Sequence, residues 1–176
     1  MKTETLAAKP AKSRKVIAEA TDGQTRIAVK KILAPTDFSP ASKKALEYAL
    51  RFAGESHSEI TLLHILESVV PLTFEGITMP APEPETESSE AESSLKALVA
   101  SVRGRGIASV RATFRRGIAS HEIVEAAKEL DVDLIVMATH GYTGWKHFAI
   151  GSTAERVVRA APCPVLVVRE KEHDFL

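Results

Sequence analysis

"LIVMATHGYTGWKHFAIGSTAERVV", residues 134–158, joins an apolar segment to a helical pattern through a loop that contains three glycines. The run Leu134–Val136 predicts a buried strand, and the spacing of apolar residues after Ser152 predicts a helix. A strand followed by a helix is the repeating unit of an α/β fold. The connecting loop is either a plain turn or a cradle for a phosphate, and the rest of the chain bears on that choice.

The same alternation of strand and helix runs through the chain upstream and downstream. Strands that alternate with helices predict a parallel sheet, with right-handed crossovers that place helices on both faces. The first helix begins with Ser39 as its N-cap and Pro40 at its first position, and Gly54 is expected to end it. The expected strands are residues 31–34, 59–68, 108–117, 132–141 and 162–170, and the expected helices are residues 38–54, 93–104, 120–130 and 152–161.

Two segments interrupt this rhythm. Residues 1–25 are polar and lack a sustained period, which predicts a flexible tail ahead of an ordered domain at residues 26–176. Within that domain, residues 68–92 carry several prolines and then acidic residues, and they are expected to form a long loop.

Composition excludes several classes of protein. The 23 basic and 23 acidic residues balance to a net charge of zero, so no basic surface predicts nucleic-acid binding. The chain has no stretch of about 20 apolar residues and no apolar signal-peptide core, which predicts a soluble, cytoplasmic protein without membrane contact. The six histidines show no metal-binding spacing, and Cys163, the one cysteine, is expected to be a buried apolar residue.

A ligand of such a sheet is expected beyond the carboxyl ends of the strands, where the winding direction reverses. Two strand ends are chemically distinctive, namely Asp37 after the first strand and the glycine-bearing loop after the fourth. Glycines 141, 144 and 151 allow positive φ and close approach of the backbone, so consecutive N–H groups of the loop can surround an anion. The hydroxyls of Ser152 and Thr153, with the helix N-terminus, add donors for phosphate oxygens.

Each of these features also has a purely structural explanation. Ser152 and Glu155 fit a capping box, in which Ser152 is the N-cap and Glu155 the third helical residue. Asp37 fits a cap or turn residue ahead of the first helix, although its carboxylate also suits a ribose or a base amino group and would repel a phosphate. The residues alone leave both explanations open.

The loop pattern resembles that of the universal stress protein family, in its UspA-like, ATP-binding subgroup. The family pattern is glycine, two residues, glycine, nine residues, glycine, then serine or threonine. Here Ala138, Gly141, Gly151 and Ser152 take those positions, with nine residues between the last two glycines. The resemblance covers roughly residues 28–170 and extends to "PTDFS" at 35–39, "LLHI" at 62–65 and "APCPVLVVR" at 161–169.

The resemblance implies an adenine nucleotide alpha hydrolase-like fold, with five parallel strands in the order 3-2-1-4-5 and helices on both faces. It implies ATP as the ligand, with magnesium as a candidate companion ion, and a stress-response regulator as the function. The positions that correspond to the family's ligand site are Pro35, Thr36, Asp37, Ile65, Met137, Ala138, His140, Gly141, Gly151, Ser152 and Thr153.

The chain departs from the family pattern at two positions. Ala138 replaces the first glycine, and Tyr142 stands where many relatives have a basic residue, with Lys146 and His147 as candidate substitutes. Trp145 is expected to pack the loop onto the domain. The alternatives are therefore a structural or partner-binding member without a nucleotide and, less favoured, a slow ATPase for which no catalytic residue is evident.

The apolar last strand would lie at an edge of the sheet in this order. An exposed apolar edge promotes aggregation unless it is paired or covered. Pairing of Val165–Val168 with the same strand of a second copy would cover it, which predicts a homodimer.

Overall fold

The computed structural model describes residues 29–67, 84–139 and 150–170, together with the backbone of two short strand pairs. One pair, β1 (Ala20–Thr21) with β2 (Gln24–Thr25), falls in the predicted tail, of which residues 1–19 lie outside the described part. The other pair, β5 (Thr73–Phe74) with β6 (Ile77–Thr78), falls in the predicted loop.

A five-stranded parallel sheet forms the centre of the molecule. Its strand order is β7-β4-β3-β8-β9, which in sequence order of these five strands is 3-2-1-4-5, so the predicted fold is confirmed. The strands are β3 (Lys31–Pro35), β4 (Glu59–Leu66), β7 (Val110–Arg116), β8 (Leu134–Ala138) and β9 (Val165–Val168). The helices are α1 (Pro40–Ser56), α2 (Pro84–Gly104), α3 (Ala119–Leu130) and α4 (Ser152–Ala160).

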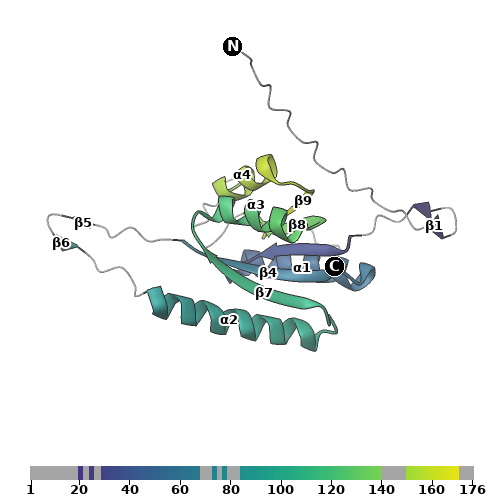
Figure 1. Cartoon of the computed structure of the whole chain (residues 1–176), viewed down its shortest axis with the longest axis horizontal. Coiled ribbons are helices and arrows are strands. Elements are labelled where there is room, and N and C mark those ends of the chain that lie inside the picture. The colour runs from purple at the N-terminus through teal and green to yellow at the C-terminus, as the bar shows by residue number, and fades with distance from the viewer. Residues whose placement is uncertain are drawn as a thin grey trace, which may run out of the picture.

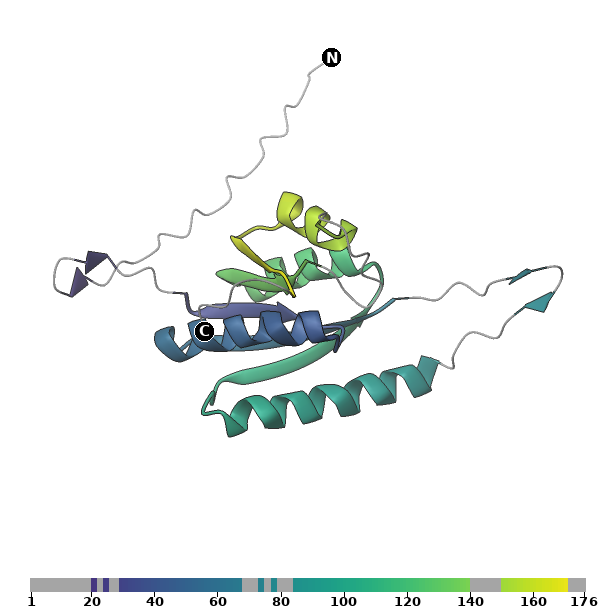
Figure 2. The same cartoon turned by 180° about the vertical axis from the view of Figure 1, so that it is seen from behind.

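Helices cover both faces of the sheet, as Figures 1 and 2 show. One apolar cluster joins α1 and α2 to the sheet, and it includes Ile32, Leu62 and Val136. The second joins α3 and α4 to the opposite face, and it includes Leu33, Leu63 and Ile135. Neighbouring residues of one strand thus enter different clusters, because side chains alternate between the faces of a sheet. Burial on both faces explains the continuous apolar runs in the sequence.

The first helix begins as predicted and ends later than predicted. Ser39 is its N-cap and accepts a hydrogen bond from the Ser42 N–H, with Pro40 at the first position. Gly54 does not end the helix, which continues to Ser56 and closes at His57 in the left-handed conformation (φ 53°). A single glycine inside a helix costs only about 1 kcal/mol relative to alanine, so the helix can continue for two residues beyond Gly54.

The prediction of irregular structure as far as residue 92 is wrong for residues 84–92. Helix α2 begins at Pro84, well ahead of the expected start. Proline is compatible with the first turn of a helix, because the N–H group that it lacks would have no partner within the helix. Pro84, the last proline of the segment, therefore marks the start of α2. The prediction from sequence placed it in the loop.

The amino ends of β3 and β8 are joined through a side chain. Asp133 precedes β8, and its Oδ2 accepts hydrogen bonds from the backbone N–H groups of Lys30 at 2.8 Å and Lys31 at 2.9 Å. The Nζ of Lys31 donates to the carbonyl of Leu130, which ends α3, at 2.9 Å. These bonds hold the starts of the two central strands together.

We expect Leu33→Ala to lower the free energy of unfolding by about 2–5 kcal/mol, because it opens a cavity where the side chain is fully buried. Urea unfolding at a fixed protein concentration measures the loss. Val158→Ala is the control: this side chain is 49% exposed, and its loss should change stability by less than about 0.5 kcal/mol. Similar losses for the two variants would contradict the assigned core.

Candidate functional site

The sheet opens between its two central strands at their carboxyl ends. The ladder between β3 and β8 comprises two pairs, Ile32 with Leu134 and Leu33 with Ile135. Beyond it, β3 stays paired with β4 as far as Pro35, and β8 stays paired with β9 as far as Ala138. The two halves of the sheet therefore separate just where the winding direction reverses. We call this place the β3–β8 opening.

The turn after β3 forms one wall of the β3–β8 opening. Pro35 and Thr36 are buried, and the Thr36 N–H extends the ladder by donating to the carbonyl of Leu63 at 2.8 Å. The Thr36 hydroxyl oxygen accepts from the Phe38 N–H at 3.1 Å. Phe38 adopts a left-handed conformation with φ 63°, which is rare for a residue other than glycine, so the surrounding contacts must hold it there.

His64 supports this turn from the neighbouring strand. Its Nδ1 lies 2.8 Å from the carbonyl oxygen of Thr36. A carbonyl oxygen only accepts hydrogen bonds, so Nδ1 carries the hydrogen. The imidazole also lies against the ring of Phe38, with centroids 4.6 Å apart and planes inclined by 38°. The sequence excludes a metal role for His64 by its spacing but assigns it no other role; its place in an otherwise apolar strand end was the signal for this support.

Asp37 is half-buried in the turn, and its carboxylate organises the start of α1. Oδ1 accepts from the Ser39 hydroxyl at 2.6 Å and from the Ser39 N–H at 3.1 Å. The structural explanation of Asp37, as a turn residue ahead of the helix, is thus correct. It also fixes the carboxylate at the carboxyl end of β3, beside the β3–β8 opening.

Ile65 follows His64 in β4 and is half-buried. With Phe38 and His64 it lines a hollow of about 340 Å³ between the end of β4 and the first half of α2. The predicted site residues of the first two strands therefore gather around one turn. Three carboxylates also border the hollow, at Glu67 directly after β4 and at Glu87 and Glu90 on α2.

The opposite wall consists of the end of β8 and the start of α4. Met137 is buried in the α3–α4 cluster, whereas Ala138 packs toward the α1–α2 cluster. Thr139 is buried, and its N–H donates to the carbonyl of Val168 at 2.9 Å. The Thr139 carbonyl then accepts from the Gly151 N–H at 2.9 Å. That bond places the start of α4 directly beside the end of β8, a contact that the sequence reading did not anticipate.

The capping box predicted for α4 is absent from the structure. Gly151 is the N-cap, so Ser152 is the first helical residue and its side chain is exposed. Glu155 turns away from the N-terminus and pairs with Arg159 at 2.9 Å. Gly151 has φ −60°, so it does not use the positive φ that a glycine allows. A glycine N-cap has no side chain that could accept from the first N–H groups of the helix, and among the described residues no side-chain cap bond forms there. A helix N-terminus of this kind suits an anion.

Ala138 takes an ordinary strand conformation. It lies in β8 opposite Val168, and no positive φ occurs there. Extended backbone suits alanine as well as glycine, so the replacement of the first family glycine causes no strain. Its methyl group packs toward the α1–α2 cluster.

Several predicted residues lie outside the part of the chain that the structure describes. They all belong to residues 140–149, between the bonded positions Thr139 and Gly151. They comprise the site residues His140 and Gly141, the departure at Tyr142, and Gly144, Trp145, Lys146 and His147.

Cys163 lies apart from this site, between α4 and β9, and is half-buried. Burial, followed by the nearby negative charge of Asp133, raises the pKa of its thiol. The thiolate is therefore scarce at neutral pH, which agrees with the prediction of an unreactive side chain.

Among the described residues, no group of three His, Cys, Asp or Glu side chains is arranged to hold a metal ion. In the same residues, no helix has the length and apolar character needed to cross a membrane.

Comparison with known proteins identifies the family. The model of the universal stress protein family matches residues 28–169. The chain belongs to the universal stress protein family. It is 35% identical over 147 residues to a universal stress protein of Methanocaldococcus jannaschii, covering 82% of this chain and 85% of that one.

Solved structures of universal stress proteins show the same fold. UspA of Lactobacillus plantarum is 27% identical and matches with a TM-score of 0.70 over 82% of this chain and 100% of its own. A universal stress protein in complex with cAMP is 19% identical and matches with a TM-score of 0.62 over 82% of this chain and 99% of its own.

We expect His64→Leu to lower the free energy of unfolding by about 1–2 kcal/mol, because the Thr36 carbonyl loses its side-chain donor. His64→Asn should retain most of the stability, since an amide N–H can reach the position of Nδ1. Urea unfolding compares the two, with His57→Asn as a control at an αL position that asparagine tolerates. Equal losses for Leu and Asn would show that ring packing, and not the hydrogen bond, is the contribution of His64.

Proposed function

We propose that this universal stress protein is a stress-response regulator that binds ATP at the β3–β8 opening. The carrying observation is the pairing of two walls with different chemistry. Asp37 lies at the end of β3, and the uncapped N-terminus of α4 is bonded to the end of β8. A nucleotide has the matching polarity, with a ribose and base that donate hydrogen bonds and a phosphate chain that is anionic.

The charges set the orientation of the ligand. The Asp37 carboxylate accepts from ribose hydroxyls or a base amino group and repels phosphate, so it belongs at the nucleoside end. Phosphates belong at α4, where the first N–H groups, the helix dipole and the exposed Ser152 hydroxyl favour an anion. ATP carries several negative charges, and Mg²⁺ is the cation that we expect to accompany its phosphates.

The remaining site residues complete the proposal. In the proposed complex with ATP, Pro35 and Thr36 shape the first wall. The backbone of Ile65 contacts the adenine, and Met137 and Ala138 line the ligand. Gly141, Gly151, Ser152 and Thr153 hold the ribose and phosphates, with His140 beside them. A universal stress protein of the same fold has been solved in complex with cAMP. That complex concerns the other protein, and for this chain the support is its own two walls.

A second candidate function is a partner-binding module without a nucleotide. Ala138 favours it, because a glycine stands at this place in the family pattern. The strand conformation of Ala138 weakens that argument, since no glycine-only geometry is lost. A slow ATPase is the third candidate, and we assign no catalytic residue to it.

We further propose a cytoplasmic homodimer formed through β9. Within the described residues, β9 pairs only with β8, so its outer edge is open. The edge strand Val165–Val168 consists of apolar residues. Pairing with the same strand of a second copy would satisfy the backbone groups and cover the side chains.

We expect two variants to separate the ends of the ligand. Asp37→Asn keeps an acceptor for Ser39 but removes the charge, and it should weaken binding of ATP and of adenosine alike, by about tenfold. Ser152→Ala should weaken ATP severalfold and leave adenosine unchanged, because adenosine has no phosphate. Isothermal titration calorimetry measures both ligands, with Glu55→Ala on the exposed surface of α1 as the control.

Absence of any heat signal, of a thermal shift at millimolar ATP and of copurified adenine absorbance would overturn nucleotide binding. An equal loss of ATP and adenosine binding in Ser152→Ala would overturn the proposed orientation while leaving nucleotide binding itself intact. Phosphate release that vanishes in Asp37→Asn would favour the ATPase.

We expect sedimentation velocity to show a dimer at micromolar concentrations that is insensitive to moderate salt, because the proposed contact is apolar and formed by backbone hydrogen bonds. Val167→Pro, which removes a backbone donor from the edge strand, should shift the equilibrium toward monomer. A monomer at every concentration would contradict the proposed dimer. Circular dichroism of the variant establishes that it stays folded.

A further inference from the structure

The second edge of the sheet, at β7, combines an open strand with an open groove. Within the described residues, β7 pairs with β4 on one side and with no strand on the other. Five of its seven residues are exposed, which is unusual for an edge that a helix accompanies. Between β7 and α2 runs a groove of about 610 Å³, which we call the α2–β7 groove.

The floor of the α2–β7 groove is apolar. From the strand come Val110, Ala112 and Phe114, and from the helix come Leu95 and Val99. Val110 and Leu95 are buried in the core, but the Phe114 side chain is 37% exposed and Ala112 is exposed. An apolar aromatic next to unpaired backbone groups offers both kinds of contact that an added strand uses.

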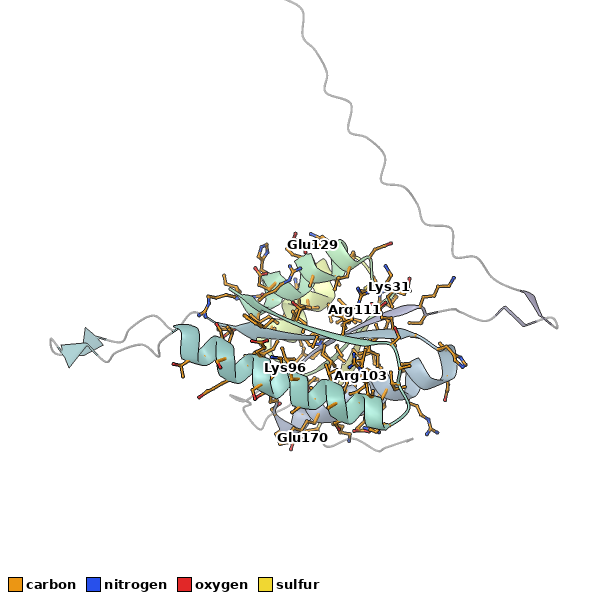
Figure 3. All side chains as sticks on the ribbon, turned by 60° about the horizontal axis from the view of Figure 1, so that its bottom comes forward. Lys31, Lys96, Arg103, Arg111, Glu129 and Glu170 are labelled. Atoms are coloured by element: carbon orange, nitrogen blue, oxygen red, sulfur yellow. The ribbon has the colours of Figure 1, made fainter. Side chains whose placement is uncertain are left out.

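The rim of the groove is basic. Three cations, Lys96, Arg103 and Arg111, border it together with one carboxylate, Glu92. Lys96 pairs with Glu92 at 2.7 Å, and Arg111 pairs with Glu59 of β4. Arg103 forms no ion pair with any residue that the structure describes. Figure 3 shows Lys96 and Arg103 on α2 and Arg111 nearby on the strand.

The two faces of β7 differ in chemistry. Val110, Ala112 and Phe114 face α2, whereas Arg115 on the alternate face pairs with Glu122 and Glu129 of α3. A strand added beside β7 would place alternate side chains over the apolar groove and the others beside Arg111 on the opposite face. Apolar residues suit the first set and acidic residues the second.

A second copy of the chain fits this edge poorly. The two-fold antiparallel register that pairs all seven residues of β7 would place Arg111 opposite Arg115 of the other copy. It would also place the charged Arg116 opposite Val110. Like charges directly opposite each other destabilise a strand pair. Self-pairing over the full length of β7 is therefore unfavourable, whereas a strand of the opposite charge complements this edge.

We infer that β7 and the α2–β7 groove form a docking site for an extended peptide segment of a partner protein, in which apolar and acidic residues alternate. The segment adds to the open edge of β7 as a further strand. Its apolar side chains lie on Ala112 and Phe114, toward α2, and its carboxylates lie on the opposite face of the sheet, beside Arg111. This site lies on the opposite edge of the sheet from β9, and it is independent of nucleotide binding and of the proposed dimer.

The test uses the full chain and a capped, fluorescein-labelled heptapeptide of alternating glutamate and valine. Fluorescence anisotropy at low ionic strength should show saturable binding. The lysine–valine peptide of the same length should bind at least about tenfold more weakly. A glutamate–valine peptide with two adjacent central prolines should also bind at least about tenfold more weakly. Each proline lacks a backbone N–H group, and two adjacent prolines remove one such donor from each edge of the peptide strand.

Arg111→Glu should weaken binding of the glutamate–valine peptide by about tenfold. Arg159→Glu is the matched control, because Arg159 and Arg111 are both exposed arginines that pair with a glutamate, and it should change binding less than about twofold. Thermal unfolding followed by circular dichroism establishes that both variants are folded. Hydrogen exchange with the bound peptide should protect the amides of β7.

The other outcomes would overturn the inference. They are no saturable binding up to millimolar peptide, equal binding of the lysine–valine peptide, and protection of β9 in place of β7. A self-association that Arg111→Glu alters would assign this edge to a second copy, which also contradicts the inference.

Discussion

The reversal of winding direction between β3 and β8 is the constraint on which the rest of the molecule depends. The two central strands are held together at their amino ends, where Asp133 accepts from the N–H groups of Lys30 and Lys31. They separate after two ladder pairs, because β3 continues with β4 and β8 continues with β9. The two halves thus diverge from a fixed base, and the β3–β8 opening is a consequence of topology that needs no special residue.

The walls of the opening are built by different means. A left-handed Phe38 bends the first wall, and contacts from the buried Thr36 and from His64 of the next strand support it. The second wall rests on one backbone hydrogen bond between Gly151 and Thr139, which brings the start of α4 to the sheet. The first wall carries a carboxylate, and the second carries the N-terminus of a helix whose N-cap is a glycine. This polarity, and not the number of glycines, is the strongest argument for a nucleotide.

The two edges of the sheet solve the problem of unpaired backbone in opposite ways. Strand β9 is apolar and uncharged, which suits pairing with an identical strand. Strand β7 carries three arginines, and the like charges that oppose each other in a two-fold pair discourage self-association. An uncharged, apolar edge strand such as β9 thus suits a second copy of the chain. A charged edge strand such as β7 suits a different partner.

The sequence by itself determined the order of elements, the parallel sheet and the Ser39 cap, because hydrophobic period and capping chemistry are local properties. It also placed Asp37 and the start of α4 at one edge, since parallel strands end together. It misread Pro84, Gly54 and the Ser152 cap, where a residue compatible with two local structures was resolved by packing. Only the tertiary structure decided that His64 supports the Thr36 turn and that β7 borders an open groove. Those features join residues distant in the chain, and no local pattern records which side chains meet.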